Sequence, residues 1–182
     1  MFQQVVSSLI FLLVIPFLYV KIVLRKNLSD FGIQKGERAT GLAWSIISIV
    51  VAFLILYLFI QYFNFLNKYN LPGTVQKSFT LFIGYEVFLV GFFVALYEIF
   101  FRGFVMFTFS GKLGHWSVLL QGIAFFLLIW LSGSLNWTMA PYIMLAFLSG
   151  ITAFYSRSII YSFALSLFFM ILVDSIFIKL AK

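Results

Sequence analysis

Four ionisable side chains stand inside long apolar stretches of this sequence: Glu86, Glu98, Arg102 and Asp174. A charged group deep in hydrocarbon is costly unless it is paired or faces a watery cavity, so these residues are the first candidates for chemistry. Glu98 and Arg102 are four residues apart, which on a helix places them on one face within reach of an ion pair. Gly103 follows and would permit close approach of another backbone. Two interpretations stay open: a structural pair that locks neighbouring helices, or a pair lining a cavity that receives a peptide end or lipid headgroup.

The other polar residues of the apolar stretches are assigned separately. Asp174 is interpreted either as a third member of this network or as a lone polar contact to a serine or tyrosine. Glu86 lies twelve residues before Glu98, about 120° around an ideal helix, so we expect it to face elsewhere and to be solvated near the outer interface. His115 beside Trp116 is predicted to be an interfacial pair and not a ligand.

Composition excludes several catalytic chemistries. The chain has no cysteine, which removes disulfides, thiolate nucleophiles and zinc-thiolate sites, and its single histidine removes any His-rich metal site. Asp174 is the only aspartate in an apolar stretch, so an aspartyl dyad cannot form. Ser149 has no histidine nearby to activate it. No axial ligand is placed for a haem, and we expect no cofactor.

One short string resembles a known family. Residues 97–103 read Tyr-Glu-Ile-Phe-Phe-Arg-Gly, which resembles the Glu-Glu-x-x-x-Arg-Gly signature of the CPBP family, the intramembrane CAAX-type proteases and bacteriocin-processing enzymes. The segment Leu28–Ser45 resembles the loop that precedes that family's core. The segment Gly150–Asp174 resembles its last two core helices. The resemblance extends over residues 25–178, and only the seven-residue string is specific.

The resemblance implies a metalloprotease in which a glutamate and two histidines, helped by an Asn or Asp, hold and activate a water inside the membrane. This sequence departs from that pattern at each of these positions. The first glutamate, expected to act on the water, is Tyr97. The Phe-x-x-x-His motif falls at Phe126–Trp130, or alternatively at Phe125–Ile129, with no histidine in either register. The His-x-x-x-Asn/Asp motif falls at Met170–Asp174, where a methionine replaces the histidine.

These substitutions predict a vestigial site without catalysis. A catalytic metal usually has three protein ligands and an open position for water, whereas Glu98 and Asp174 provide only two hard ligands. We therefore expect no metal and no catalytic residue; if the chain is active after all, Glu98 and Arg102 would carry the activity. The vestigial site comprises eight positions: Tyr97, Glu98, Arg102, Gly103, Phe126, Trp130, Met170 and Asp174.

The elements that must position these residues are membrane helices. The 182 residues are 64% hydrophobic and 9% charged, with mean hydropathy +1.13, which excludes a soluble domain. The sequence predicts an all-α, polytopic transmembrane bundle of about six spans with a CPBP-like core. We treat residues 1–182 as one integral membrane domain, with an N-terminal anchor helix over 1–26 that is not a removable signal peptide and a core over 27–182.

Apolar runs and loops set the expected spans. Polar loops are expected over 27–40 and 67–77, where Asn70 precedes a Pro-Gly turn. The third run is longer than one crossing needs, so we expect its helix to end or break near Arg102 and Gly103, with an interfacial segment following up to His115. The six expected spans are Val5–Leu24, Gly41–Leu66, Ser78–Phe109, Trp116–Leu131, Thr138–Tyr155 and Ile159–Ile178.

The net charge of +7 is interpreted as a topology signal. The basic residues are sparse and stand between apolar runs, which argues against a nucleic-acid partner. If the 27–40 loop is cytoplasmic, that side holds Lys21, Arg25, Lys26, Lys35, Arg38, Arg102, Lys112 and Arg157. The other side holds Lys68, Lys77, Lys179 and Lys182. This distribution predicts both termini outside. The expected location is a prokaryotic inner membrane.

Three function classes follow. The favoured hypothesis is a catalytically degenerate CPBP-like protein that holds another membrane protein, or a lipidated or hydrophobic peptide, in the former active-site cavity. The alternative is an active CAAX-type or leader-peptide endopeptidase that uses Glu98. A small transporter or channel subunit ranks last, because the fourth and fifth spans show no continuous polar stripe.

Overall fold

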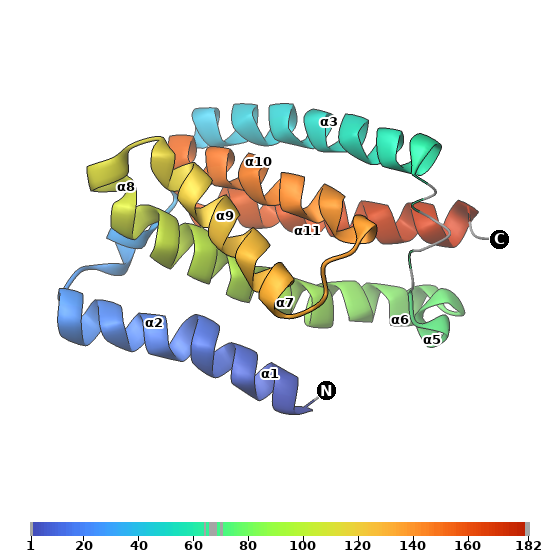
Figure 1. The fold of residues 1–182 in the computed structure, drawn as a ribbon, viewed down its shortest axis with the longest axis horizontal. Helices are drawn as coiled ribbons and strands as arrows, with labels where there is room; N and C mark the ends of the chain where they lie inside the picture. Colours follow the sequence, from blue (N-terminus) through green and yellow to red (C-terminus); the bar gives the residue numbers. More distant parts are fainter. Residues whose placement is uncertain (1, 64, 66–68, 70, 181–182) are drawn as a thin grey trace.

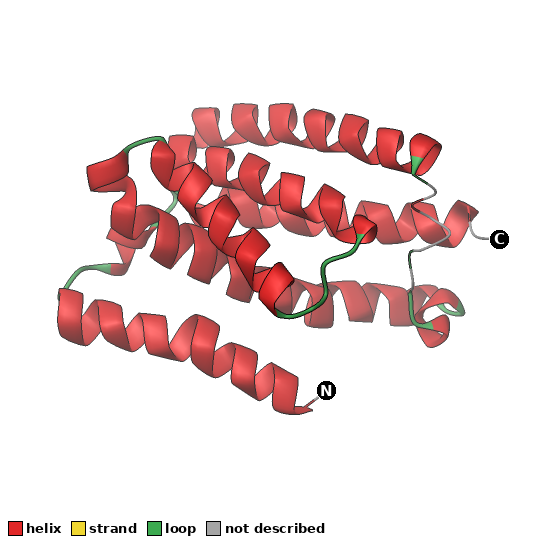
Figure 2. Cartoon of the chain, in the orientation of Figure 1, coloured by secondary structure: helices red, strands yellow, loops and turns green. Residues whose placement is uncertain are grey.

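The part of the chain that the structure describes is mostly helical. This computed structural model describes residues 2–63, 65, 69 and 71–180, and no strand occurs among them (Figure 2). Three expectations lie outside the described residues: the end of the second span at Leu66, the loop residues Asn67 and Asn70, and the basic residues Lys68 and Lys182.

Five helical runs are long and apolar enough to cross a membrane, which identifies a membrane-embedded chain. They are Val5–Leu24, Arg38–Tyr62, Phe79–Leu113, Trp137–Ser156 and Ile159–Leu180. The predicted fourth span is the apolar helix α9 (Trp116–Leu131). Its 16 residues extend about 24 Å, less than the hydrocarbon thickness of roughly 30 Å. Five runs, and not six, therefore reach full length among the described residues.

The N-terminal run is one rod of alternating α and π segments. Its parts are α1 (Phe2–Leu9), η1 (Ile10–Val14), α2 (Ile15–Leu18) and η2 (Tyr19–Leu24). Pro16 lacks a backbone N–H, and the π segment before it is one way a helix accommodates that missing hydrogen bond. Arg25 adopts a left-handed conformation (φ 52°) and ends the rod. The helical run therefore ends at Leu24, the expected end of the first span.

A short polar connection follows. The 3-10 segment η3 (Leu28–Phe31) is capped at its N-terminus by Asn27, which forms a capping box with Asp30. Gly32, with φ +73°, caps its C-terminus. The connection then lies against the turn between the last two helices: Glu37 N donates to the Ser156 carbonyl at 2.8 Å, and Ser158 Oγ donates to the Gln34 carbonyl at 2.5 Å. These contacts hold residues 32–37 on the end of the bundle.

The third run is a continuous helix of 35 residues, Phe79–Leu113, and the expected break at Arg102 and Gly103 is wrong. It contains α6 (Phe79–Gly84), η4 (Tyr85–Val90), α7 (Gly91–Tyr97), η5 (Glu98–Met106) and α8 (Phe107–Leu113), after the short α5 (Gly73–Gln76). Around Gly103 the helix widens into a nine-residue π segment and does not end. It stops at Gly114, whose φ of +54° leaves helical space.

Helix α10 (Ala140–Ser156) is the centre of the bundle. It packs against α3 (Arg38–Tyr62), α9 and α11 (Ile159–Leu180), as Figure 1 shows. The segment η6 (Trp137–Met139) leads into it. The largest buried apolar cluster joins α3, α10 and α11, and comprises Ala52, Leu56, Phe65, Leu145, Leu165, Phe169 and Val173. The N-terminal rod lies outside this core, along the third run.

Candidate functional site

The predicted ion pair is formed and buried. Glu98 Oε1 lies 3.5 Å from Arg102 Nη1, and the side chains are 2% and 4% exposed. Both residues stand in η5, which packs against α9, α10 and α11. The sequence-based expectation that the two side chains meet on one helix face is therefore confirmed.

Each member of the pair reaches a different neighbouring helix. The Glu98 carboxylate accepts hydrogen bonds from Ser162 Oγ at 2.5 Å and from Ser166 Oγ at 2.8 Å, both on α11. Arg102 Nη2 donates to the Ala146 carbonyl at 3.2 Å and to Ser149 Oγ, both on α10. The pair thus ties three helices together at one level of the bundle, which is the structural interpretation of the two that the sequence left open.

A glutamine on α9 completes this polar layer. Gln121 Nε2 donates to the same Ala146 carbonyl at 2.9 Å. Gly150 lies beside it, where a Cβ would come within 2.3 Å of the Gln121 amide nitrogen. Sequence reasoning missed Gln121 and the serines of α11, although the i, i+4 spacing of Ser162 and Ser166 is a signal that could have identified them.

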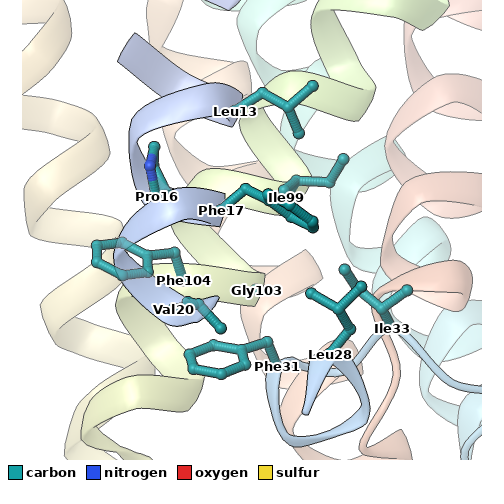
Figure 3. Close-up of a pocket in the computed structure, with 10 residues that line it drawn as sticks. All are labelled: Leu13, Pro16, Phe17, Val20, Leu28, Phe31, Ile33, Ile99, Gly103 and Phe104. Atoms are coloured by element: carbon teal, nitrogen blue, oxygen red, sulfur yellow. The ribbon is translucent and has the colours of Figure 1, made fainter. Parts of the chain in front are cut away.

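Gly103 acts through close approach to a second backbone, as predicted. Its missing side chain leaves room for the Phe31 carbonyl oxygen, 3.3 Å from where a Cβ would stand. Figure 3 shows this region: Gly103 and Ile99 face η3 and the N-terminal rod across an apolar pocket of about 220 Å³. The glycine therefore positions the third run against the N-terminal connection.

A larger cavity of about 580 Å³ lies between the N-terminal rod, the third run, α9 and the last two helices. Four of its lining residues are positions that the sequence analysis compared with the CPBP motifs, namely Tyr97, Phe125, Ile129 and Met170. Their side chains are apolar or phenolic. The other lining residues are Ser7, Ser8, Phe11, Leu12, Leu128, Ser132, Ser134, Met139 and Tyr142.

The face of α9 that lines the cavity is not the one that carries Phe126 and Trp130, the two α9 positions named in the vestigial site. Phe126 and Trp130 are 37% and 57% exposed, on the outside of the bundle. Phe125 packs edge-on against Tyr97, with ring centroids 5.9 Å apart, and against Phe101 at 5.3 Å. The alternative register, Phe125–Ile129, is therefore the one that lines the cavity.

Asp174 lies apart from the Glu98 and Arg102 pair. It is eight residues beyond Ser166 on α11, about 12 Å along the helix. Its carboxylate accepts a hydrogen bond from the Tyr69 hydroxyl, to which Tyr142 donates at 3.1 Å. The interpretation as a polar contact to a tyrosine is confirmed, and a third place in the ion-pair network is not observed.

Glu86 is buried, and the expectation that water solvates it is wrong. The residue is 0% exposed, and neither carboxylate oxygen has a hydrogen-bond donor among the described residues. The reason is its π segment, η4, which packs against α11 and turns Glu86 toward that helix. A helical-wheel angle measured from Glu98 could not reveal this, because the π segment η4, which lies between the two residues, shifts the angle.

His115 lies on the surface beside two aromatic rings. It is exposed, and its ring lies 4.9 Å from that of Phe154 and 5.7 Å from that of Tyr155. Trp116 beside it is 70% exposed. No group of three His, Cys, Asp or Glu side chains that could hold a metal ion occurs among the residues described.

Comparison of the chain with protein-family models, with curated proteins and with solved structures finds no match. No relative therefore assigns a role to any residue described above.

Proposed function

We propose that this protein is an integral membrane protein that binds a hydrophobic or lipidated peptide segment of a membrane partner without cleaving it. The binding site is the 580 Å³ cavity, and the chain is a catalytically degenerate relative of the CPBP proteases. One observation carries the proposal. The positions at which the family motif would place its water-activating glutamate and its two histidines all line this cavity, as Tyr97, Ile129 and Met170.

The chemistry of the lining supports binding over hydrolysis. Phenol, alkyl and thioether groups stand where a metal site would need carboxylate and imidazole, so no metal-bound water would form there. Glu98 is committed to Ser162, Ser166 and Arg102 and does not line the cavity. An apolar chain would gain contact with the aromatic and aliphatic walls, while the serines supply hydrogen bonds to a peptide backbone.

The position of the cavity supports entry from the bilayer. One wall is the N-terminal rod, through Ser7, Ser8, Phe11 and Leu12, and the facing wall is α9. The rod lies outside the central core, so a lipid-borne ligand reaches the cavity by passing beside it. In this proposal the predicted anchor is a wall of the site as well as a membrane attachment.

Topology forms part of the proposal. Helix α9 makes a sixth crossing. Because it is a few ångströms shorter than the hydrocarbon layer, the bilayer thins around it. The connection over 27–40 and the turn at Arg157 share the end of the bundle richest in Lys and Arg, and we assign that end to the cytoplasm of a prokaryotic cell, with both termini outside.

A labelling experiment with a defined probe tests this function. Purified protein in lipid nanodiscs is irradiated with a farnesylated peptide that carries a photoreactive group, and adducts are mapped by mass spectrometry. Ile129→Trp, which fills the cavity, should abolish labelling that unlabelled peptide competes away. Phe126→Trp is the matched control on the outer face of α9 and should label as the wild type does.

The same samples distinguish the other function classes. Cleaved probe together with bound zinc would favour the peptidase alternative. Labelling that is equal in the two tryptophan variants, or that excess peptide does not compete away, would overturn the proposal.

A further inference from the structure

A second polar site lies apart from the cavity lining and the ion pair. Glu86 on η4 and Asp174 on α11 lie where these two segments pack together, beside the apolar cluster that Tyr85, Ile171 and Phe177 share. Glu86 is 0% exposed and Asp174 is 4% exposed. Asp174 accepts a hydrogen bond from Tyr69, which lies between α3 and α5 in the chain.

The donors around the two carboxyl groups serve only one of them. Tyr69 donates to Asp174 Oδ1, and Tyr142 donates to the Tyr69 oxygen at 3.1 Å. Burial, with Tyr142 and Asp174 close by, raises the pKa of Tyr69 above its usual value, so the phenol remains a neutral donor. Glu86 has no donor for either oxygen among the described residues. If both groups were ionised, Glu86 and Asp174 would present only acceptor oxygens to each other.

No described positive charge compensates the pair. Tyr85 and Tyr142 are the titratable groups near both carboxyls, and neither carries a positive charge. Lys77 and Lys179 are exposed, and the salt bridge recorded among the described residues is that of Glu98 with Arg102. Two carboxyl groups buried in neighbouring segments without a cation cannot both remain ionised.

We propose that Glu86 and Asp174 form a proton-binding site, in which one proton is held between the two carboxyl groups. The proton supplies the donor that Glu86 lacks and leaves Asp174 free to accept from Tyr69. Neither carboxyl lines any of the five cavities described, and two carboxylates are fewer ligands than a metal ion takes, so a proton fits where a hydrated cation does not.

The site has a consequence for the Tyr69 connection. When the proton leaves, Glu86 becomes a second negative charge near Asp174. The hydroxyl groups of Tyr69 and Tyr142 would then be the only nearby donors. The folded chain therefore holds a proton that the unfolded chain has released at neutral pH. Its free energy of unfolding falls as the pH rises, until the folded chain releases the proton too.

Infrared difference spectroscopy tests the site directly, because the chain has only five acidic residues. At neutral pH the wild type should show the carbonyl stretch of one protonated carboxylic acid, shifted in heavy water. Glu86→Gln should remove that band and flatten the alkaline loss of thermal stability, since its amide supplies a permanent donor. Asp174→Asn should remove or displace the band. Glu37→Gln, at an exposed position, is the control and should leave the band unchanged.

Two outcomes would overturn the site. One is a wild-type spectrum at neutral pH without a protonated acid band. The other is a band that persists unchanged in both Glu86→Gln and Asp174→Asn.

Discussion

Glu98 Oε1 and Arg102 Nη1 lie 3.5 Å apart, one turn from each other in the π segment at the middle of the bundle. The carboxylate faces α11 and the guanidinium faces α10, so the pair links two helices as well as its own. Serines of α11 and groups of α10 form hydrogen bonds with this charged pair, although Arg102 Nε has no partner among the described residues, and the pair is a structural element of the bundle.

Removing one member of the pair should cost more than removing both. Arg102→Met leaves the Glu98 carboxylate buried without its counter-ion, and we expect a loss of about 3–5 kcal/mol in the free energy of unfolding. Glu98→Gln combined with Arg102→Met should recover part of that loss, because the amide introduced at position 98 is neutral and still meets Ser162 and Ser166. Thermal unfolding in detergent measures both variants. Equal losses in the single and double variants would mean that the two charges do not interact.

Alanine substitutions at two glycines can distinguish the cost of backbone strain from the cost of a steric clash. Gly36 (φ +61°) and Gly133 (φ +69°) both have left-handed backbones, but a Cβ on Gly36 would lie 2.2 Å from the Ser156 carbonyl oxygen, whereas Gly133 has open space. Gly133→Ala should cost about 1–2 kcal/mol from strain alone. Gly36→Ala should cost about 1–3 kcal/mol more, since the connection must move off the turn between α10 and α11. If thermal unfolding shows equal costs, residues 32–37 do not dock on that turn.

The helical class and most span boundaries could be predicted from composition and apolar run length, since hydrocarbon thickness dictates both. The ion pair followed from an i, i+4 spacing, which is a local property. The misplaced break at Gly103, the burial of Glu86 and the register of α9 share another cause. They depend on π segments and on which helices pack together. In the almost uniformly apolar helix α9, a shift of one residue decides whether Phe125 or Phe126 faces the interior. The spacing of apolar residues does not identify the buried face of a helix when every face is apolar.

The register of α9 can be tested by paired truncations. Phe125→Ala removes two edge-to-face ring contacts, with Tyr97 and Phe101, and should cost about 1–3 kcal/mol. Phe126→Ala removes an outward-facing ring and should cost less than about 0.5 kcal/mol. Unfolding midpoints of the two variants in the same detergent provide the comparison. The reverse order of costs would place Phe126 inside and remove Phe125 from the cavity.

Metal removal should have no effect on the folded protein. The cavity presents Tyr97, Ile129 and Met170 where ligands would stand, so chelator treatment should leave the unfolding temperature and peptide labelling unchanged. Elemental analysis of protein purified without chelator should find zinc far below one ion per chain. Stoichiometric zinc, with a chelator-sensitive unfolding temperature, would contradict the assignment of a site without catalysis.

Cross-linking from two adjacent positions tests the central claim most directly. A photoreactive benzoyl-phenylalanine is incorporated at position 125, which lines the cavity, or at position 126, which faces outward, and native membranes are irradiated. We predict a discrete peptide adduct from position 125, competed away by the farnesylated peptide, and lipid adducts alone from position 126. Lipid adducts alone from both positions would contradict a peptide-binding cavity.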